Sequence, residues 1–282
     1  MLKRFLCAVF FLGVLPAFAE LPPGDRAPEF PKDAIWLGVR GTPPTMKELR
    51  GKVVIVDFWE YTCINCIRTF PHLKEWYQRY HSAGIEIIGV HKGEFQFASD
   101  PENVRRAYDR FQLPYPSIVD VHDVVWRAYD SHSWPNSFLI DRRGLIHEVH
   151  QGEGNYGSFE REIQRLLQQG HRELDFSKFV IQPDAPLFGP ACGPESPEIY
   201  VGFERGALWG GQMANHQGFH PKKVVDYAPT TKRVKRGFFV AGEWRNHADD
   251  FESVSGSRPE KEVYLGTTYQ GRDVYAVFNR SS

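Results

Sequence analysis

Residues 53–71 read V-V-I-V-D-F-W-E-Y-T-C-I-N-C-I-R-T-F-P, and this stretch decides the fold. The run from Val53 to Trp59 is apolar and rich in β-branched side chains, which is typical of a strand buried on both faces. After Cys63, apolar side chains recur at helical spacing until the chain reaches Gly84, a residue type that favours helix C-termini. A buried strand therefore leads into a helix, and a C-x-x-C motif lies where the two join.

The same alternation continues along the first half of the chain. Apolar runs like the first strand alternate with stretches of helical periodicity. Strands that alternate with helices imply parallel βαβ units, so we predict an α/β domain over residues 34–175. Besides the opening strand and helix, the expected strands are 85–90 and 137–140, and the expected helices are 103–111 and 158–167.

The second half of the chain has a different character. Prolines and glycines crowd together between residues 182 and 197, which marks a boundary, and helical periodicity disappears beyond it. We predict a Pro/Gly-rich linker over residues 176–197 and a small all-β, sandwich-like module over residues 198–282. The expected short strands of this module are 198–203, 237–243, 262–269 and 273–278.

The N-terminus has the three parts of a secretory signal peptide. Lys3 and Arg4 form a basic start, an apolar run follows, and residues 17–19 (A-F-A) fit an A-x-A cleavage site. The apolar run is shorter than the roughly 20 residues that a membrane-spanning helix needs. We predict a signal peptide over residues 1–19, an extended lead-in over residues 20–33, and a soluble periplasmic or extracytoplasmic protein after cleavage. An uncleaved anchor is the alternative.

Composition excludes some classes of function. The 282 residues include 34 basic and 35 acidic side chains, so there is no basic excess that would favour a nucleic-acid partner. Four cysteines are too few for a disulfide-stapled miniprotein. Cys7 falls in the leader. Cys192 lies in the linker, where an incidental free thiol is the simplest interpretation and a third redox cysteine or an intermolecular bridge is the alternative.

The chemistry is expected at Cys63 and Cys66. A helix N-terminus directs free backbone N–H groups and the positive end of the helix dipole at the residue that lies there, which stabilises a thiolate. Cys63 is therefore the predicted nucleophile, and Cys66, one turn into the helix, would resolve a mixed disulfide by attacking Cys63. C-x-x-C near a βαβ pattern is a redox signature. No separate cofactor and no metal are expected, because the redox-active disulfide Cys63–Cys66 itself would exchange the electrons.

Residues near this motif are candidates for supporting roles. Asp57 lies inside an otherwise apolar strand, where a carboxylate is costly, so we predict that it takes and returns the proton of Cys66. A salt-bridged carboxylate without that role is the alternative. Pro135 precedes the apolar run at 137–140, and a cis proline there would shield the thiols. The residues expected to contact substrate or shield the disulfide are Trp59, Trp134, Ile64 and Asn65, with packing alone as the alternative for the two tryptophans.

Two simpler interpretations of the cysteine pair stay open at this point. One is an inert structural disulfide. The other is half of a zinc site, because zinc usually takes four ligands, and the candidate additional ligands are His72, His91 and His132. Glu60 and Glu94 are expected to be solvated, and a second-carboxylate role near the thiols is the alternative.

The pattern V-D-F-W-x-x-x-C-x-x-C, with Pro71 five residues further on, resembles thioredoxin. Longer strings narrow the resemblance: F-W-E-Y-T-C-I-N-C-I-R-T-F-P, G-V-H-x-x-E-F, D-P-E-N-V-R-R-A, and S-W-P-N-S-F-L-I-D-x-x-G followed by G-E-G-N-Y. Together they look like the TlpA-like branch of exported thioredoxins, and specifically like the thioredoxin-like domain of DipZ-type proteins. The resemblance implies a thioredoxin fold, a central mixed sheet flanked by helices, in which Cys63 and Cys66 are the redox pair, Pro135 is the cis-proline and Asp57 is the buried acid.

The resemblance also bears on partners. DipZ-type proteins have a membrane electron-transfer portion, so a DsbD- or CcdA-like membrane protein is the implied electron donor. The dipeptide between the cysteines is Ile-Asn rather than the Gly-Pro of thioredoxin, which bears on the redox potential. The C-terminal module is similar to the DipZ-type C-terminal domain through S-P-E-I-Y-V-G-F and residues 242–244 (G-E-W). This implies a carbohydrate-binding-like sandwich, short enough here to be incomplete, and a glycan partner.

We therefore predict an exported thiol–disulfide oxidoreductase that reduces protein or small-molecule disulfides through a Cys63/Cys66 dithiol–disulfide cycle. One alternative is a thiol peroxidase of the AhpC or peroxiredoxin type, which shares the fold but needs a P-x-x-x-T-x-x-C arrangement, whereas here Thr62 adjoins Cys63. The other is a glycan- or partner-binding protein in which redox chemistry is secondary. Its candidate sugar-stacking side chains are Trp209, Phe219, Trp244, Tyr264 and Tyr269.

Overall fold

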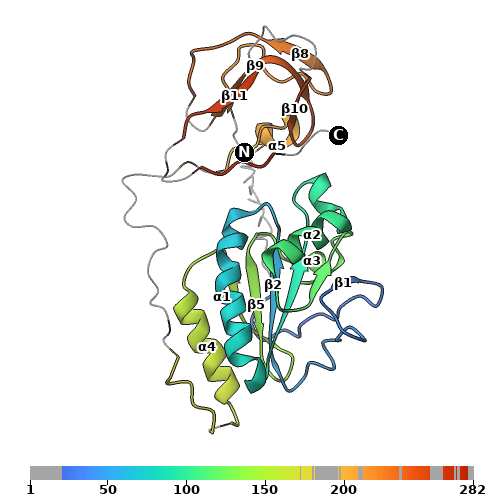
Figure 1. Cartoon of the computed structure of the whole chain (residues 1–282), viewed down its shortest axis with the longest axis vertical. Coiled ribbons are helices and arrows are strands. Elements are labelled where there is room, and N and C mark those ends of the chain that lie inside the picture. The colour runs from blue at the N-terminus through green and yellow to red at the C-terminus, as the bar shows by residue number, and fades with distance from the viewer. Residues whose placement is uncertain are drawn as a thin grey trace, which may run out of the picture. The chain divides into compact units, whose positions relative to one another are not determined.

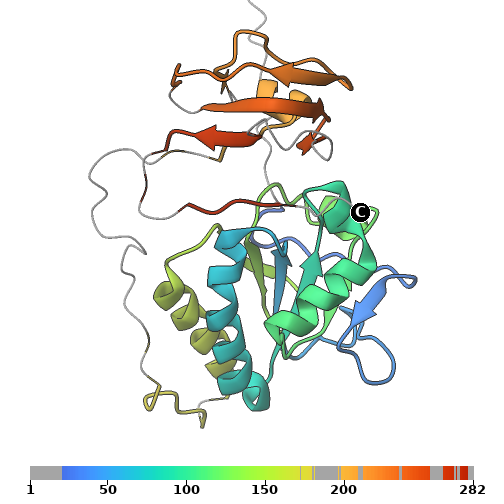
Figure 2. The same ribbon diagram turned by 45° about the horizontal axis from the view of Figure 1, so that its top comes forward.

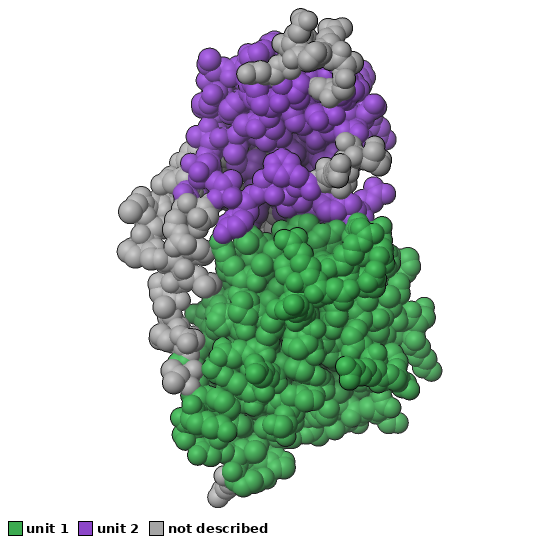
Figure 3. All heavy atoms as spheres, viewed as in Figure 1, with its two compact units in different colours: residues 1–94, 98–183 green, residues 95–97, 184–282 purple. Residues whose placement is uncertain are grey.

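A computed structural model of the chain describes residues 21–171, 173–179, 181, 196, 198–208, 212–234, 237–254, 263–269, 271 and 274–278. The chain separates into two compact units, which Figure 3 shows in two colours: residues 1–94 with 98–183, and residues 95–97 with 184–282. The predicted signal peptide, Cys7, most of the predicted linker and Cys192 lie outside the described residues.

The first unit is built on a six-stranded sheet with the strand order β1-β4-β3-β2-β5-β6 (Figure 1). β2 is parallel to β3 and β3 to β4, whereas β5 is antiparallel to β2 and β6 is antiparallel to β5. The sheet is therefore mixed, as predicted, and β2 and β3 lie at its centre. Its strands are β1 Ile35–Leu37, β2 Val53–Trp59, β3 Ile85–His91, β4 Ser117–Val119, β5 Asn136–Ile140 and β6 Ile146–Gln151.

Helices cover both faces of this sheet, which gives the predicted thioredoxin-like fold. α1 and α4 run side by side in Figures 1 and 2, and Trp76 of α1 packs against Phe159 of α4 with ring centroids 5.4 Å apart. The helices are α1 Ile64–Tyr80, α2 Pro101–Phe111, α3 Val124–Ala128 and α4 Tyr156–Gln168, with short 3-10 turns η1 His81–Ala83 and η2 Gln96–Ser99.

Strand β2 is buried along its whole length because it contributes to two cores. Ile55 and Trp59 pack into the core that α1, α2 and α4 cover, whereas Val56 and Phe58 pack into the core that α3 joins. Side chains alternate between the two faces of a strand, so Asp57 shares the face of Ile55 and Trp59. The apolar run of the sequence thus places one carboxyl group on the side of the sheet that α1 covers.

Helix α1 begins directly after β2 and ends at Tyr80, with Pro71 inside it. The 3-10 turn η1 extends the helical segment to Gly84, whose φ is 101°. This left-handed conformation favours glycine, because a Cβ atom would be strained there. The helical segment therefore stops at the residue that the sequence indicated.

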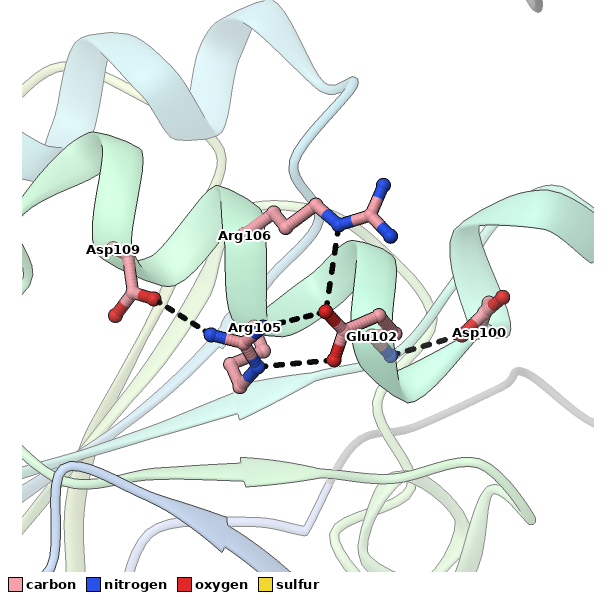
Figure 4. A network of polar contacts seen from close by, with 5 residues as sticks. All are labelled: Asp100, Glu102, Arg105, Arg106 and Asp109. Carbon is pink, nitrogen blue, oxygen red and sulfur yellow. Dashed lines mark hydrogen bonds and ion pairs between the residues drawn. The ribbon is translucent and has the colours of Figure 1, made fainter.

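Helix α2 has a network of exposed charges along its solvent side (Figure 4). The Asp100 carboxylate caps the helix by accepting the Glu102 N–H at 2.9 Å. Arg105 pairs with Glu102 and also with Asp109 one turn later, and Arg106 approaches Glu102 at 3.5 Å. Exposed ion pairs contribute little to stability, so burial of Val104 and Ala107 on the opposite face does most to hold α2 in place.

The second unit is organised around one long strand, β9, which pairs with each other strand described in that unit. Tyr227, Phe238 and Val240 are at the centre of its core. The strands predicted at 237–243 and 262–269 correspond to β9 and β11. The elements are α5 Phe203–Leu208, β7 Gln212–Met213, β8 Val224–Tyr227, β9 Gly237–Asn246, β10 Phe251–Ser253 and β11 Tyr264–Thr267.

Two of the short strands predicted for this unit are wrong. Residues 198–202 form no strand, and Phe203 instead begins helix α5, so the unit is not all-β. The backbone N–H groups of Phe203 and Glu204 bond to the carbonyls of His247 and Ala248, outside any strand. Residues 274–278 also form no strand, and their side chains are exposed. A short apolar pattern predicts a strand only where a sheet edge is available to pair with it.

Candidate active site

The cysteine motif lies where β2 ends and α1 begins. Cys63 is the N-cap residue of α1, with φ −76° and ψ 107°, and its Sγ accepts a hydrogen bond from the Cys66 N–H at 3.3 Å. A free N–H of the first helical turn thus points at the sulfur, which is the arrangement that stabilises a thiolate. Both cysteines are free thiols, and the Cys63 side chain is only partly buried, so a substrate disulfide can reach it.

Cys66 is in a different environment, although it is only one turn away. Its side chain is fully buried. Burial raises the pKa of the Cys66 thiol well above its usual value, and the neighbouring Cys63 and Asp57 raise it further. Cys66 therefore keeps its proton at neutral pH and needs a base before it can attack another sulfur.

Asp57 lies on β2 and shares the face of Ile55 and Trp59, which pack in the same core as Cys66. The Asp57 side chain is 1% exposed, and Ser137 Oγ on the adjacent strand β5 donates a hydrogen bond to its Oδ1 at 2.6 Å. Burial raises the pKa of Asp57 to about 7, while the Ser137 hydrogen bond works in the opposite direction. Among the described residues no cation pairs with this carboxyl group. A carboxyl of this pKa next to a protonated buried thiol can exchange a proton with it near neutral pH.

The proline candidate lies at the start of β5. The peptide bond between Trp134 and Pro135 is cis, and the Pro135 carbonyl accepts the Gly152 N–H at 2.8 Å. Asn136, the next residue, is fully buried and begins the strand. The loop before β5 is thus held to the loop after β6, next to the strand that supplies Ser137.

The predicted shielding residues fall into two groups. Trp59 is fully buried and packs edge-on against His91, so packing is its first role. Trp134 is half-buried and stacks on Trp126 with ring centroids 4.6 Å apart, while Lys92 Nζ lies 5.4 Å from the Trp134 ring centroid. The two residues between the cysteines, Ile64 and Asn65, are both half-buried.

Comparisons with known proteins identify the family. A family model described as the AhpC/TSA family matches residues 23–149. The thiol-disulfide oxidoreductase ResA of Geobacillus kaustophilus is 30% identical over 143 residues, which cover 51% of this chain and 77% of ResA. The chain belongs to the TlpA- and DipZ-type thioredoxin family. The resemblance inferred from the sequence motifs is thereby confirmed.

Other members of the thioredoxin family match different shares of the chain. Protein DipZ of Mycobacterium tuberculosis is 32% identical over 263 residues, which cover 92% of this chain but 36% of DipZ. The chain therefore spans about a third of the length of that relative. A solved structure described as a thiol:disulfide interchange protein DsbE from Chlorobium tepidum is 25% identical, covers 52% of this chain and 99% of its own, and has a TM-score of 0.46.

Ser137 was not recognised from the sequence as a residue of this thioredoxin-family site, and Glu60 was considered there only as the alternative to a solvated side chain. Glu60 was expected to be solvated, but its side chain is fully buried beside His91, so that expectation is wrong. Glu94 is half-buried. Ser137 was assigned no role, although it supplies the hydrogen bond to Asp57. The sequence offered one indication of this contact. Ser137 lies two residues after Pro135, in a strand predicted to lie beside the cysteines, and it pairs with Asp57 in the β2–β5 register.

The histidines proposed as zinc ligands lie in separate environments. His72 stacks on Tyr156 with ring centroids 3.7 Å apart, His91 packs against Trp59, and His132 pairs with Asp130 at 3.1 Å. In the described part of the chain, the only three-residue group with metal-ligand spacing comprises His147, Glu148 and Glu162, which does not involve the cysteines. His72, His91 and His132 thus each have a described partner other than the cysteines.

Proposed function

We propose that this chain is a thiol–disulfide oxidoreductase that reduces disulfides of proteins or small molecules through a cycle of Cys63 and Cys66. The observation that carries the proposal is the hydrogen bond from the Cys66 N–H to the Cys63 Sγ at the N-terminus of α1. It provides an accessible sulfur with a donor for negative charge, while a second, protonated sulfur lies buried in the next turn.

The cycle consists of two exchange steps. The Cys63 thiolate attacks one sulfur of the substrate disulfide, so that an enzyme–substrate disulfide forms and the other substrate sulfur leaves as a thiolate and takes up a proton. Cys66 then loses its proton and attacks Cys63 Sγ, which forms the Cys63–Cys66 disulfide and releases the second substrate sulfur. Two electrons pass from the enzyme dithiol to the substrate. A dithiol donor must return two electrons before the next turnover.

Asp57 is the proposed base of the second step. Its pKa of about 7 allows it to accept the Cys66 proton near neutral pH and to return it when the enzyme is reduced again. Ser137 holds the carboxyl group in place through its hydrogen bond to Oδ1. Pro135 and Trp134 are proposed to border the position of the bound substrate next to Cys63.

Reduction of insulin by the dithiol form tests this proposal. We expect the wild-type protein to accelerate insulin reduction, and Cys63→Ser to abolish the acceleration. Cys66→Ser should still perform the first step and therefore accumulate an enzyme–substrate disulfide, visible as a covalent adduct on a non-reducing gel. Circular dichroism of both variants controls for folding. Insulin reduction by a folded Cys63→Ser variant would overturn the mechanism.

We also propose that the protein acts outside the cytoplasm and is re-reduced by a DsbD- or CcdA-like membrane protein. The support is the leader-like N-terminal sequence and the membership of the DipZ-type family. No helix in the described ranges combines the length and hydropathy that a bilayer crossing requires. In the Cys66→Ser variant, incubated with membranes of the source organism, the Cys63 thiolate should attack the disulfide of the oxidised donor and trap it as a mixed disulfide, with release of the donor's other sulfur as a thiol. Trapping of soluble proteins alone would contradict the proposed donor.

A thiol peroxidase is the second candidate, because the matching family model is described as AhpC/TSA. The threonine of the peroxidase pattern lies three positions before the reactive cysteine, whereas Thr62 adjoins Cys63. The Thr62 N–H and hydroxyl both bond to the Glu60 carboxylate, so this side chain is already engaged. We expect the protein to consume peroxide slowly. Fast, saturable consumption would instead favour the peroxidase over the disulfide reductase.

Glycan binding by the second unit is proposed as an added activity that depends on exposed aromatic side chains. Trp244 does not qualify, since it is buried and its Nε1–H donates to the Ala241 carbonyl at 2.8 Å. Phe219 packs against the core, and Trp209 lies outside the described residues. Tyr269 is exposed. Tyr269→Ala in the full chain should therefore reduce retention on cell-wall polysaccharide, and unchanged retention would remove this residue from the proposal.

A further inference from the structure

One pair of buried side chains beside Cys63 has no role in the cycle described so far. Glu60 directly follows β2 and His91 ends β3, and the register of these two strands places Trp59 opposite His91. The side chains of Glu60 and His91 are 0% and 1% exposed. Glu60 Oε1 lies 3.8 Å from His91 Nε2, and neither atom has a hydrogen-bond partner in the described structure.

Glu60 Oε1 and His91 Nε2 can form a hydrogen bond with each other only if one of them carries a proton. A bare carboxylate oxygen facing a bare imidazole nitrogen leaves two acceptors unsatisfied, which is rare for buried groups. If one of the two atoms carries a proton and the distance between them shortens by about 1 Å, the contact becomes a hydrogen bond.

The proton belongs to Glu60 rather than to His91. Burial disfavours the charged form of each group, so it raises the pKa of Glu60 to about 7 and lowers that of His91 to about 3. The imidazole then accepts the proton from a neutral carboxyl group. Trp59 packs edge-on against the His91 ring and Tyr61 stacks on it, with ring centroids 4.7 and 5.4 Å away, which holds the imidazole in this position.

Glu60 is also connected to the reactive cysteine. Its carbonyl accepts the Cys63 N–H at 3.3 Å, and its Oε2 accepts the Thr62 N–H at 2.7 Å. The turn over residues 60–63 thereby holds the carboxyl group and the Cys63 backbone in one hydrogen-bonded loop. The Cys63 N–H favours the charged form of the Glu60 carboxyl group and so lies close to it. A negative charge on Glu60 would therefore oppose a thiolate at Cys63, because like charges that lie close together disfavour each other.

We propose that Glu60 and His91 are positioning residues that share one proton and thereby set the pH at which Cys63 becomes a thiolate. This inference rests on the proposed function. With the proton in place, Glu60 is neutral and the Cys63 thiolate forms unopposed. When the proton is released to solvent, the Glu60 carboxylate raises the pH that thiolate formation requires. The protonated pair thus allows Cys63 to ionise at a lower pH than it would beside an ionised Glu60.

The other titratable groups around the pair act in definite directions. The charge of Glu94, three residues after His91, raises the pKa of Glu60 further, and the ammonium group of Lys92 lowers that of His91. Both effects favour the neutral pair with its proton on Glu60. Tyr61, which stacks on the His91 ring, has its own pKa raised by burial and by the charge of Glu60. The titratable groups on the adjoining elements are Cys63 and Cys66 at the start of α1 and Asp57 on β2, whose partner is Ser137.

Glu60→Gln and His91→Gln distinguish this role from a structural one, because they should move Cys63 in opposite directions. Glu60→Gln removes the opposing charge, so the pH midpoint of Cys63 alkylation should fall by about one unit. His91→Gln places an amide donor against Glu60, which stabilises the carboxylate, so the midpoint should rise by about one unit. Mass spectrometry of the Cys63 peptide measures the alkylation rate at each pH in the full chain.

Glu160→Gln is the matched control. Glu160 is also buried, but it pairs with Arg79 at 2.9 Å and accepts a hydrogen bond from Tyr80 at 2.5 Å, and neither contact involves Cys63. This variant should leave the alkylation midpoint unchanged. Shifts of Glu60→Gln and His91→Gln in the same direction, or no shift in either, would overturn the inference.

A measurement on the unsubstituted protein keeps the inference testable if a variant does not fold. NMR titration of the Glu60 side-chain carboxyl carbon should give a midpoint of about 7. A midpoint near the ordinary value of about 4.3 would overturn the shared proton. Insulin reduction by the wild-type protein tests the proposed function separately. Its absence would overturn that function, whereas an active protein with an ordinary Glu60 titration would overturn only the role of the pair.

Discussion

Replacing Asp57 by asparagine should stabilise the fold at neutral and alkaline pH while it slows the redox cycle. The Asp57 carboxyl group is buried, and its hydrogen-bond partner among the described residues is Ser137, which donates to Oδ1 at 2.6 Å. Asparagine offers a carbonyl oxygen for the same hydrogen bond. The substitution therefore removes the ionisable proton and leaves the shape and the Ser137 contact in place.

The magnitude follows from the raised pKa of Asp57. Burial moves this pKa from 3.8 to about 7, and about three units at 1.36 kcal/mol each correspond to about 4 kcal/mol. Because the pKa is higher in the folded state, the folded protein binds this proton more tightly than the unfolded chain does. Burial of the Asp57 carboxyl group does not lower the free energy of unfolding below about pH 3.8. The loss grows as the pH rises from there to about 7, and it is complete above that value.

Urea unfolding of the reduced full-length protein at several pH values measures this difference, with tryptophan fluorescence as the signal. Asp57→Asn should give little gain in the free energy of unfolding near pH 4 and a gain approaching about 4 kcal/mol near pH 8. In the insulin assay the same variant should accumulate the enzyme–substrate disulfide, because Cys66 has lost its base. A gain in stability that is the same at every pH would refute the argument from buried ionisation. Resolution as fast as in the wild type would refute the role as base.

Two further substitutions test the surroundings of the site. Ser137→Ala removes the hydrogen bond that favours the Asp57 carboxylate, so the pKa of Asp57 in the folded protein should rise by about one unit. In the same urea series, the pH at which the destabilisation is complete should rise by the same amount. An unchanged pH dependence would show that the Ser137 hydrogen bond does not set the pKa of Asp57. Gly89→Ala would place a Cβ atom 2.3 Å from Ser117 Oγ and 2.9 Å from Trp59 Nε1, so the free energy of unfolding should fall by about 1–3 kcal/mol. Adding Ser117→Ala should recover part of that loss, and a double variant no more stable than Gly89→Ala would show that crowding by Ser117 is not the cause.

The centre of the fold could be predicted because its signals are local. A strand buried on both faces must be apolar at every position, and the run from Val53 to Trp59 meets that condition with Asp57 as its single exception. Helix α1 follows at once, and its end is marked by Gly84. The same locality allowed the cysteines to be placed at a helix N-terminus, since the strand, the motif and the helix are contiguous in the sequence.

The burial of Glu60 could not be predicted, because it depends on a distant part of the chain. A glutamate just after a strand is usually solvated, and only the β2–β3 register brings His91 beside it. Ser137 became the partner of Asp57 through the antiparallel pairing of β5, another contact between distant residues. In the second unit, the error at residues 198–203 has a similar origin, because a loop at His247 and Ala248, not a strand, receives the backbone bonds of α5.

The buried carboxyl groups of the first unit differ in their partners. Asp120 caps helix α3 by accepting the Val124 and Trp126 N–H groups at 2.8 Å. Glu160 pairs with Arg79, and Glu86 pairs with Lys52 at 3.0 Å, so each lies beside a cation that balances its charge. Asp57 and Glu60 have hydroxyl and imidazole neighbours in place of a cation, and burial raises the pKa of both to about 7. A fold gains nothing in stability from two uncompensated acids at one end of its central strand. Their common location, just before the cysteine motif, is explained if Asp57 exchanges a proton with Cys66 and a neutral Glu60 places no charge beside Cys63.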